Sequence, residues 1–324
     1  MTSAPSETPP VLSVVMPLYN GEAYLGATLD GILSQSFEDF ELLIMDDGST
    51  DGSVSLAEDY ASRDSRIRVF QRENRGIPKT VNELFGLMRG RFVTRSDADD
   101  ISEPGRFALQ LAHLEAHPGV VALGGQALYI DEEARPIFVP RLPLDHDRID
   151  EMNLGGRTAF VQSSVMMRAD AVRKIGGYDV GYPFAQDLEM WLRLAEIGRL
   201  ENLGDVVLRY RFTTNGISGS SVSRQSQLAR QACQAAWARR GLPEQPFVTD
   251  HWRPGNDPAS RHDFFLKWGW QAWRAGHADT ARHFFTQATK VRPASWPAWK
   301  ARLALALGRQ PKPRKRRRSA ASSQ

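Results

Sequence analysis

The residues best suited to chemistry in this chain are Asp97, Asp99 and Asp100, which follow a β-rich run from Arg91 to Arg95. Carboxylates this close repel one another, so the cluster lowers stability unless a positive group joins it. Hard cations such as Mg²⁺ prefer oxygen ligands and are commonly held by one or two carboxylates and substrate phosphates. The D-x-D spacing puts two carboxylates on one side of an extended backbone. The pattern predicts a divalent cation site, although aspartates also cap helices and form solvated turns.

The aspartate cluster ends the fourth of a series of predicted strands. Short apolar runs predict these strands at 12–16, 41–45, 67–71 and 91–95. The segments between them carry apolar residues at helical spacing, around 22–33, 54–62 and 81–88. This alternation indicates an α/β fold with a largely parallel, doubly wound sheet.

A second acidic turn, "DDGS", follows the second predicted strand and contains Asp46 and Asp47. Ligands of doubly wound sheets bind beyond the carboxyl ends of the strands. We therefore expect the two acidic turns to lie on one rim of the sheet. Their convergence favours a ligand site over isolated helix caps.

The rest of the chain has a mixed pattern. We expect a helix at 105–116, strands near 120–130 and 159–168, a helix at 187–197 and a strand at 205–212. After about residue 220 the pattern is helical throughout. Seven of the eight tryptophans lie in that part, which indicates a domain boundary.

Composition limits the classes of protein. The formal charge is +3, but six basic residues lie between Lys312 and Arg318, so the body without them carries −3. The basic character belongs to the tail and does not indicate a nucleic-acid-binding fold. Cys233 is the only cysteine, which predicts a reducing, cytoplasmic location. We expect no secretory signal, and no apolar run reaches the roughly 20 residues that span a bilayer.

Three segments in order resemble the family 2 inverting glycosyltransferases with the GT-A fold. They read "VVMPLYNGEAYLGATLDGILSQSFEDFELLIMDDGSTDGS", "NRGIPKTVNELFGLMRGRFVTRSDADDISEPGRF" and "GGYDVGYPFAQDLEMWLRL". The resemblance covers about 11–215. It implies a Rossmann-like, mostly parallel central sheet flanked by helices, in a domain of residues 11–219.

The resemblance also implies a pocket for a nucleotide-sugar donor. In the family the first loop lines this pocket, and here that loop contains Pro17, Tyr19 and Glu22. Asp47 matches the carboxylate that hydrogen-bonds the base of the donor.

The remaining site residues are carried over in the same way. Asp99 matches the direct ligand of a divalent metal, Mg²⁺ or Mn²⁺, and Asp97 a contact to the ribose or the metal. Asp187 in "AQDLEMWLRL" matches the catalytic base. Many relatives have Glu where this chain has Gln186, so a helper carboxylate is absent while the base remains. An acceptor-side strand often has His where this chain has Gln162, which concerns the acceptor contacts and not the chemistry.

The implied reaction is sugar transfer with inversion. A cation would stabilise the nucleoside diphosphate as it leaves. Asp187 would take the proton of the acceptor hydroxyl, which typically contributes about 10²–10⁴-fold. Because Asp187 begins a predicted helix, we expect the macrodipole to favour its ionised form and weaken it as a base. A glycan or a lipid-linked glycan is the expected acceptor, which suggests polysaccharide or cell-surface glycan synthesis.

Three segments lie outside the predicted catalytic domain. Residues 1–10 and 309–324 are predicted to be disordered, and 220–308 to form a helical extension. Gly269, Ala272, Ala281, Phe285, Ala288 and Pro293 resemble a tetratricopeptide unit, so this extension could present a protein partner surface or only pack as ordinary helices. The basic run is expected to contact anionic lipid at the membrane's inner face or to remain solvated.

Other interpretations remain open. His113 and His117 have a zinc-compatible spacing but lack the H-E-x-x-H pattern, so we expect a surface pair. A sugar nucleotidyltransferase would need a basic, glycine-rich first loop, and "PLYNGEAYLG" contains no Lys or Arg. A non-catalytic adaptor that binds through the helical extension is the third alternative.

Overall fold

The computed structural model describes residues 8–212, 219–248 and 257–308, with the side chains of 219–223 excepted. The predicted basic tail and most of the predicted disordered N-terminus lie outside these ranges. Contacts divide the chain into two units, Met1–Arg253 and Pro254–Gln324. Within the described ranges, no helix combines the length and the apolar character needed to cross a bilayer.

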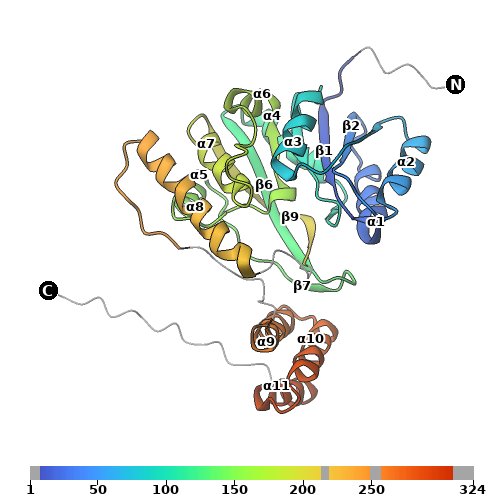
Figure 1. The fold of residues 1–324 in the computed structure, drawn as a ribbon, viewed down its shortest axis with the longest axis vertical. Helices are drawn as coiled ribbons and strands as arrows, with labels where there is room; N and C mark the ends of the chain where they lie inside the picture. Colours follow the sequence, from blue (N-terminus) through green and yellow to red (C-terminus); the bar gives the residue numbers. More distant parts are fainter. Residues whose placement is uncertain (1–7, 213–218, 249–256, 309–324) are drawn as a thin grey trace. The chain divides into compact units, whose positions relative to one another are not determined.

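The first unit is built on one nine-stranded sheet with the order β3-β2-β1-β4-β8-β6-β9-β5, and β7 pairs with β6 (Figure 1). The strands are β1 (Leu12–Leu18), β2 (Phe40–Asp46), β3 (Ile67–Gln71), β4 (Phe92–Arg95), β5 (Ile101–Ser102), β6 (Val120–Ile130), β7 (Pro136–Phe138), β8 (Met166–Arg168) and β9 (Arg199–Arg211). Strands β3, β2, β1 and β4 are mutually parallel, as are β6 and β9. The long pairings are therefore parallel, as the sequence predicts.

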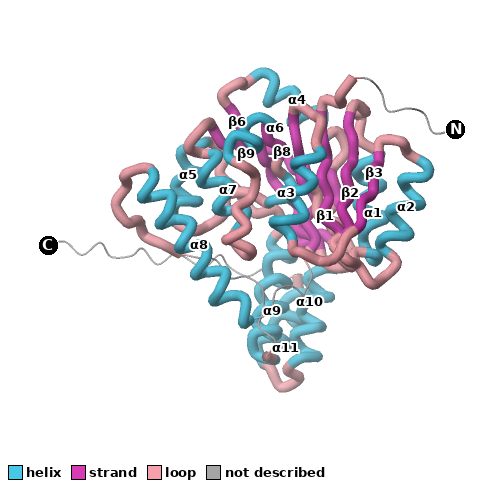
Figure 2. The backbone as a smooth tube through the Cα atoms, turned by 45° about the horizontal axis from the view of Figure 1, so that its top comes forward, coloured by secondary structure: helices cyan, strands magenta, loops and turns pink. Residues whose placement is uncertain are grey.

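Helices cover both faces of the sheet (Figure 2). The helices of this unit are α1 (Glu22–Leu33), α2 (Ser53–Arg63), α3 (Ile77–Leu87), α4 (Arg106–Ala116), α5 (His146–Leu154), α6 (Ala169–Ile175), α7 (Gln186–Leu194) and α8 (Gly219–Arg239). Side chains of successive strand residues alternate between two apolar cores: Val15 packs with α3 and α7 residues, whereas Val14 packs with α1 and α4 residues. Burial on both faces explains the continuous apolar runs.

Two segments differ from their expected structure. Residues 162–164 form a 3₁₀ turn, and of the predicted 159–168 strand Met166–Arg168 pairs as a strand. The Ser164 hydroxyl donates to the Val161 carbonyl at 2.7 Å, a local bond that competes with strand pairing. Strand β9 begins at Arg199, before the predicted residue 205.

Helix α8, which the sequence predicts as part of the helical extension, packs in the first unit. Ala229, Cys233 and Trp237 bury against Leu188 and Leu192 of α7.

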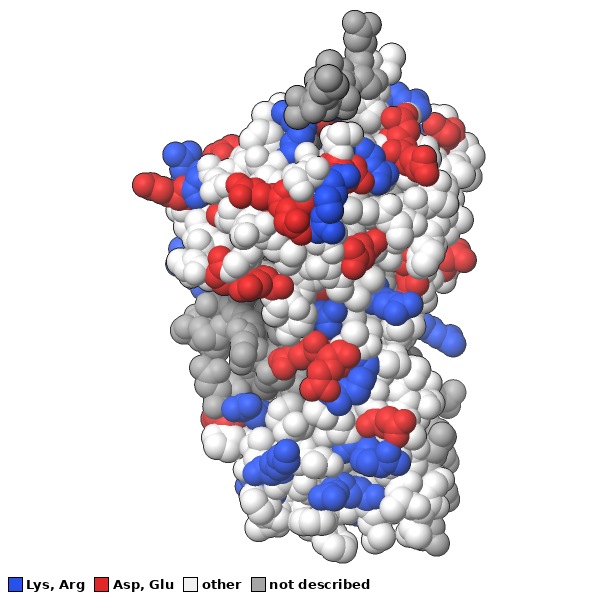
Figure 3. All heavy atoms as spheres, turned by 90° about the vertical axis from the view of Figure 1, so that its right-hand side faces the viewer, with Lys and Arg blue, Asp and Glu red and all other residues white. Residues whose placement is uncertain are grey.

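Over the face of this unit that carries α1 and α2, acidic and basic side chains are interspersed (Figure 3).

The second unit contains α9 (Pro258–Arg274), α10 (Ala278–Val291) and α11 (Trp296–Ala306). Ala281 and Phe285 of α10 are fully buried. A Cβ atom at Gly269 would lie 2.4 Å from the Phe285 ring, so glycine permits the close packing of α9 and α10. The small residues that resemble a tetratricopeptide unit therefore mark a real helix–helix contact.

Candidate active site

Both acidic turns begin at the carboxyl edge of the parallel strands. Leu18 of β1 pairs with Asp46 of β2, and on the other side Val15 pairs with Arg95 of β4. The Asp47 N–H donates to the Leu18 carbonyl at 2.8 Å. The structure thus places the "DDGS" and "SDADD" turns on either side of β1, on one rim.

The first loop is fastened to the "DDGS" turn. Asn20 accepts from the Thr50 N–H at 2.8 Å, and Glu22 accepts from the Gly52 N–H at 2.9 Å. Pro17 is half-buried and Tyr19 is exposed, with 55% of its surface accessible. The loop therefore presents Tyr19 outward, while Glu22 already has a partner within the chain.

The same loop touches the second acidic turn. A Cβ atom at Gly21 would lie 3.2 Å from the Ala98 Cβ, and the Thr28 hydroxyl donates to the Ala98 carbonyl at 3.0 Å. Small residues at 21 and 98 permit this approach. The loop between β1 and α1 connects the two turns into one surface.

Asp47 is buried, and both of its oxygens have partners. They accept from the Arg75 N–H at 2.9 Å and the Gly76 N–H at 2.8 Å, and Arg72 pairs with the carboxylate at 3.2 Å. Asp47 therefore secures the loop before α3. Carboxylate oxygens accept about two hydrogen bonds each, so the side chain can still receive one from a ligand.

Asp97 is held by cationic and hydroxyl groups of the chain. Arg95 donates to Asp97 Oδ1 at 2.8 Å from Nε and 2.5 Å from Nη2, and Ser163 donates to Oδ2 at 3.1 Å. Arg95 also donates to the Tyr178 hydroxyl at 3.4 Å. Arg95, directly beside the acidic cluster, thus supplies part of the positive charge that the cluster needs.

Asp100 is the buried member of the cluster, with 1% of its surface exposed. Its Oδ1 accepts from the Arg211 N–H at 2.9 Å, whereas Oδ2 makes no hydrogen bond in the described part of the chain. Burial raises the pKa of Asp100 well above the usual range, and Asp99 and Asp97 raise it further. The repulsion inferred from the sequence is therefore present, and Arg95 does not remove it fully.

The carboxylates of the "SDADD" turn are the oxygen ligands that a hard cation prefers. No three acidic, histidine or cysteine side chains among the described residues are arranged to hold a metal ion. A site with one or two carboxylates, completed by a diphosphate, would need fewer protein ligands than such a cluster.

Asp187 joins this group from another part of the chain. It lies in the first turn of α7 and accepts from the Leu188 N–H at 2.9 Å. Burial raises the pKa of Asp187, with the Leu188 N–H and Arg95 opposing and Asp97 adding to the rise. Burial outweighs the hydrogen bond from the helix N-terminus and the nearby Arg95, so the expectation of a weakened base is wrong in direction.

Tyr178 marks where these groups meet. Burial raises its pKa to about 12, Arg95 opposes this, and Asp187 and Asp97 add to it. Residues from the turn after β4, the α6–α7 loop and α7 therefore lie within electrostatic range of one another.

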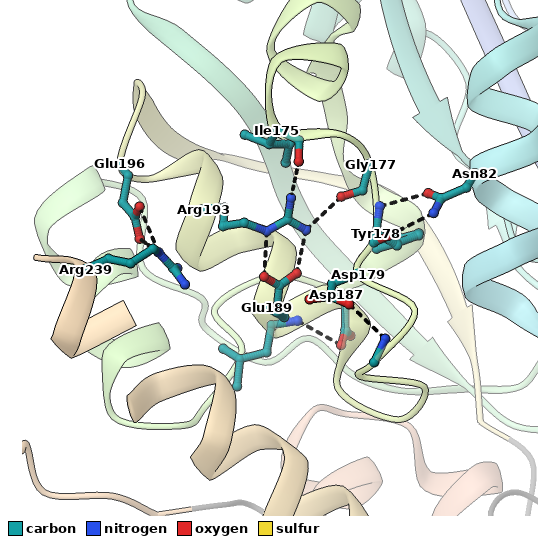
Figure 4. Close-up of polar contacts among 12 residues, drawn as sticks. Asn82, Ile175, Gly177, Tyr178, Asp179, Asp187, Glu189, Arg193, Glu196 and Arg239 are labelled. Carbon is teal, nitrogen blue, oxygen red and sulfur yellow. Dashed lines mark hydrogen bonds and ion pairs between the residues drawn. The ribbon is translucent and has the colours of Figure 1, made fainter. Parts of the chain in front are cut away.

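A buried ion pair fixes the helix that carries Asp187 (Figure 4). Arg193 pairs with Glu189 at 2.5 Å and donates to the carbonyls of Gly177, at 2.7 Å, and Ile175. Asn82 of α3 exchanges two 2.8 Å hydrogen bonds with the backbone of Tyr178. These bonds tie the α6–α7 loop to α3 and to α7.

Two glutamines at the site keep polar atoms without partners. Both side-chain polar atoms of Gln162 and the Oε1 of Gln186 are buried and make no hydrogen bond with the described residues. Gln162 precedes Ser163, and Gln186 precedes Asp187. Unpaired buried amides destabilise a fold, so they mark places where a ligand could bind.

Sequence reasoning missed the residues that support this site. Arg95 was noted only as the end of a strand, and Arg211 lies 111 positions from its partner Asp100. The i,i+4 spacing of Glu189 and Arg193 was a readable indication of an ion pair. The expected surface histidine pair is present, with His113 and His117 rings stacked at 4.2 Å.

Comparisons with known proteins point to one family. The model of Glycosyl transferase family 2 matches residues 13–176. A Bacillus subtilis (strain 168) protein described as a glycosyltransferase, EpsE, is 32% identical over 237 residues, which cover 69% of this chain and 82% of EpsE. The amylovoran biosynthesis glycosyltransferase AmsE of Erwinia amylovora is 29% identical over 62% of this chain and 76% of AmsE.

Solved structures share the fold at lower identity. The mannosyltransferase PcManGT from Pyrobaculum calidifontis, in complex with GDP-Man and Mn²⁺, has a TM-score of 0.56 and 19% identity, covering 95% of this chain and 82% of that one. TarS 1–349 of S. aureus in complex with UDP-GlcNAc has a TM-score of 0.54 and 15% identity, covering 92% of each chain. These likenesses show the GT-A fold.

Proposed function

Because the chain belongs to glycosyltransferase family 2, we propose that it moves a sugar from a nucleotide-sugar donor to a glycan or lipid-linked acceptor, with inversion. The observation that carries the proposal is the cluster of Asp187, Asp97 and Arg95 at the carboxyl edge of the sheet. Family membership makes the chain a glycosyltransferase and disfavours the nucleotidyltransferase and the adaptor.

The donor would lie across the rim between the two acidic turns. Pro17, Tyr19 and Glu22 would line the nucleotide pocket, and Asp47 would receive a hydrogen bond from the base. The fixed loops before α1 and α3 support this role, because a pocket that is already formed loses little entropy on binding.

Asp99 would hold a divalent ion, Mg²⁺ or Mn²⁺, which when bound stabilises the negative charge that develops on the leaving diphosphate. Asp97 has both oxygens occupied by Arg95 and Ser163, so it suits a ribose contact and the orientation of Arg95 better than direct metal ligation. The Mn²⁺ in the PcManGT complex supports the choice of a divalent ion.

Asp187 would act as the base. It removes the proton from the acceptor hydroxyl while that oxygen bonds to the anomeric carbon. The bond from that carbon to the diphosphate oxygen breaks, and its electron pair leaves with the diphosphate. A pKa raised by burial makes the ionised Asp187 a stronger base than an ordinary aspartate. Gln162 and Gln186 would bind sugar hydroxyls with their unpaired amide atoms.

Polysaccharide synthesis is the proposed setting. The relatives AmsE and the O-antigen biosynthesis glycosyltransferase WbnJ of Escherichia coli support it by their names. We place the reaction on the cytoplasmic side, which agrees with a single, buried Cys233 and no disulfide partner. The basic run at 312–318 would add attraction to an anionic membrane.

A donor screen with and without Mn²⁺ tests the proposal. Wild type should hydrolyse or transfer one sugar nucleotide, and Asp187→Asn should slow turnover about 10²–10⁴-fold. Asp179→Asn is the matched control, since exposed Asp179 lies in the loop just before α7 and, among the described residues, its side chain accepts from the nearby Gly181 N–H at 2.8 Å. Full activity in a folded Asp187→Asn variant would rule out this base.

A further inference from the structure

Helix α11 and its C-cap residue, Leu307, turn four large apolar side chains outward. Trp296, Trp299, Leu303 and Leu307, which we call the α11 stripe, expose 69%, 48%, 57% and 56% of their surfaces. Their spacing of three, four and four residues puts them on one face of the helix. The buried face carries alanines, such as Ala298, that are fully covered. This is the reverse of the usual pattern, in which the largest apolar residues face the core.

The stripe is held in place by contacts within its own unit. Ser295 caps α11 by accepting from the Ala298 N–H and lies 2.7 Å from His262 Nε2. The Trp299 indole donates to the Pro293 carbonyl at 2.8 Å, and the Arg302 guanidinium lies 4.8 Å from the ring centre. The exposed apolar surface therefore belongs to an ordered helix with a defined orientation.

The unit that carries the stripe is basic. Residues 257–308 contain eight Lys or Arg and three Asp, a formal charge of +5, and residues 309–324 add seven basic residues and no acidic ones. Since the whole chain carries +3, residues 1–256 carry −9. On the α9–α11 helices the visible charged side chains are mostly basic (Figure 3). Positive charge and exposed apolar surface thus occur in the same short part of the chain.

Charge and composition narrow the choice of partner. Residues 309–324 contain no apolar side chain larger than alanine or proline, so their composition does not match the stripe. A symmetric dimer through the stripe would bring two positive units together, which repel. Nucleic acid would use the charge and the tryptophans but not Leu303 and Leu307, because bases stack on aromatic rings.

An anionic bilayer surface uses every one of these features. Tryptophan favours the interface between lipid and water, and leucine enters the acyl boundary. Lys and Arg near the surface are attracted to acidic lipids. We propose that the α11 stripe docks the protein on an anionic lipid bilayer. This inference does not depend on the proposed sugar transfer, although a lipid-linked acceptor would make use of it.

Vesicle flotation of the full chain tests the proposal. Wild type should bind vesicles of phosphatidylcholine with phosphatidylglycerol at about 0.1 M salt and bind phosphatidylcholine alone weakly. Trp296→Ser with Leu303→Ser and Leu307→Ser should lower the partition coefficient at least about tenfold. Leu109→Ser, which changes an exposed leucine of α4, should bind like wild type. Thermal unfolding and donor hydrolysis without lipid should be unchanged in every variant.

Separate results would overturn the inference. Unchanged vesicle binding in the folded triple variant would assign binding to the basic residues alone. No wild-type binding to the anionic vesicles would also reject it. Two further results would assign the stripe to another partner. One is a dimer of the full chain that the triple variant no longer forms. The other is binding of a single-stranded oligonucleotide that depends on the stripe, when vesicle binding does not.

Discussion

The aspartates on the rim of the sheet fall into two groups that the chain treats differently. Asp46 and Asp47 accept hydrogen bonds from backbone N–H groups of Gly48, Ser49, Arg75 and Gly76. We call them the structural pair. Asp100 and Asp187 instead have pKa values raised by burial. The structural pair shapes loops, whereas burial disfavours the ionised forms of Asp100 and Asp187. Functional sites often break the rules that the rest of a fold obeys.

The largest expected effect comes from replacing Asp187, which should lower activity but raise stability. Burial raises its pKa, so the folded state binds the proton more tightly than the unfolded state does. Ionised Asp187 therefore lowers stability above the ordinary aspartate pKa of about 3.9, and the loss grows as pH rises toward the folded-state pKa. Asp187→Asn should lose about 10²–10⁴-fold in rate yet unfold at a higher temperature than wild type at pH 7.

The pH dependence gives this prediction a second readout. The stability gain of Asp187→Asn should shrink as pH falls below the ordinary aspartate pKa, because Asp187 of wild type is then protonated in both the folded and the unfolded state. Wild-type turnover should decline on acidification at a higher pH than an ordinary carboxyl would give. A variant less stable than wild type at pH 7, or an acid limb at the ordinary aspartate pKa, would show that burial does not set this pKa.

The structural pair should behave in the opposite way. Asp47→Asn removes the charge and one acceptor from a buried group that accepts two backbone N–H bonds, so the free energy of unfolding should fall by about 1–3 kcal/mol. Chemical denaturation measures this change. Asp39→Asn, at an exposed position just before β2, is the control and should stay within about 0.5 kcal/mol. Equal stability of Asp47→Asn and wild type would remove the distinction between the groups.

The ion pair under α7 should give a smaller effect on rate. Arg193→Lys keeps the charge but loses the fork that reaches Glu189 and two carbonyls, so Asp187 would be held less firmly. We expect turnover to fall about 3- to 30-fold, with the donor KM nearly unchanged, in protein shown to be folded. Arg148→Lys, in the exposed pair with Glu151, should change neither value. A changed donor KM with unchanged turnover would argue against a positioning role.

The sequence predicts most of the sheet because the patterns of strands and helices depend on residues that are close in the chain. The strand from Leu12 and the helix from Glu22 to Leu33 follow from apolar periodicity and lie where expected. The rim also follows, since parallel strands share one carboxyl edge. The 3₁₀ turn that carries Ser163 does not, because a local hydroxyl bond replaces strand pairing there.

Patterns in the sequence do not show which side chains are buried or which distant residues pair. The macrodipole argument at Asp187 used only its place on a helix, whereas the raised pKa depends on the atoms packed around it. Arg211 reaches Asp100 because β9 lies beside β5, a pairing that no spacing in the sequence indicates. The same holds for the placement of α8 on α7.

Titration calorimetry of UDP and of GDP, each with and without Mn²⁺, tests the central claim most directly. Wild type should bind one nucleotide at least about tenfold more tightly with Mn²⁺. Asp99→Asn should abolish this gain, and the Asp39→Asn control should keep it. Metal-independent binding that is the same in wild type and Asp99→Asn would contradict a cation site at this rim.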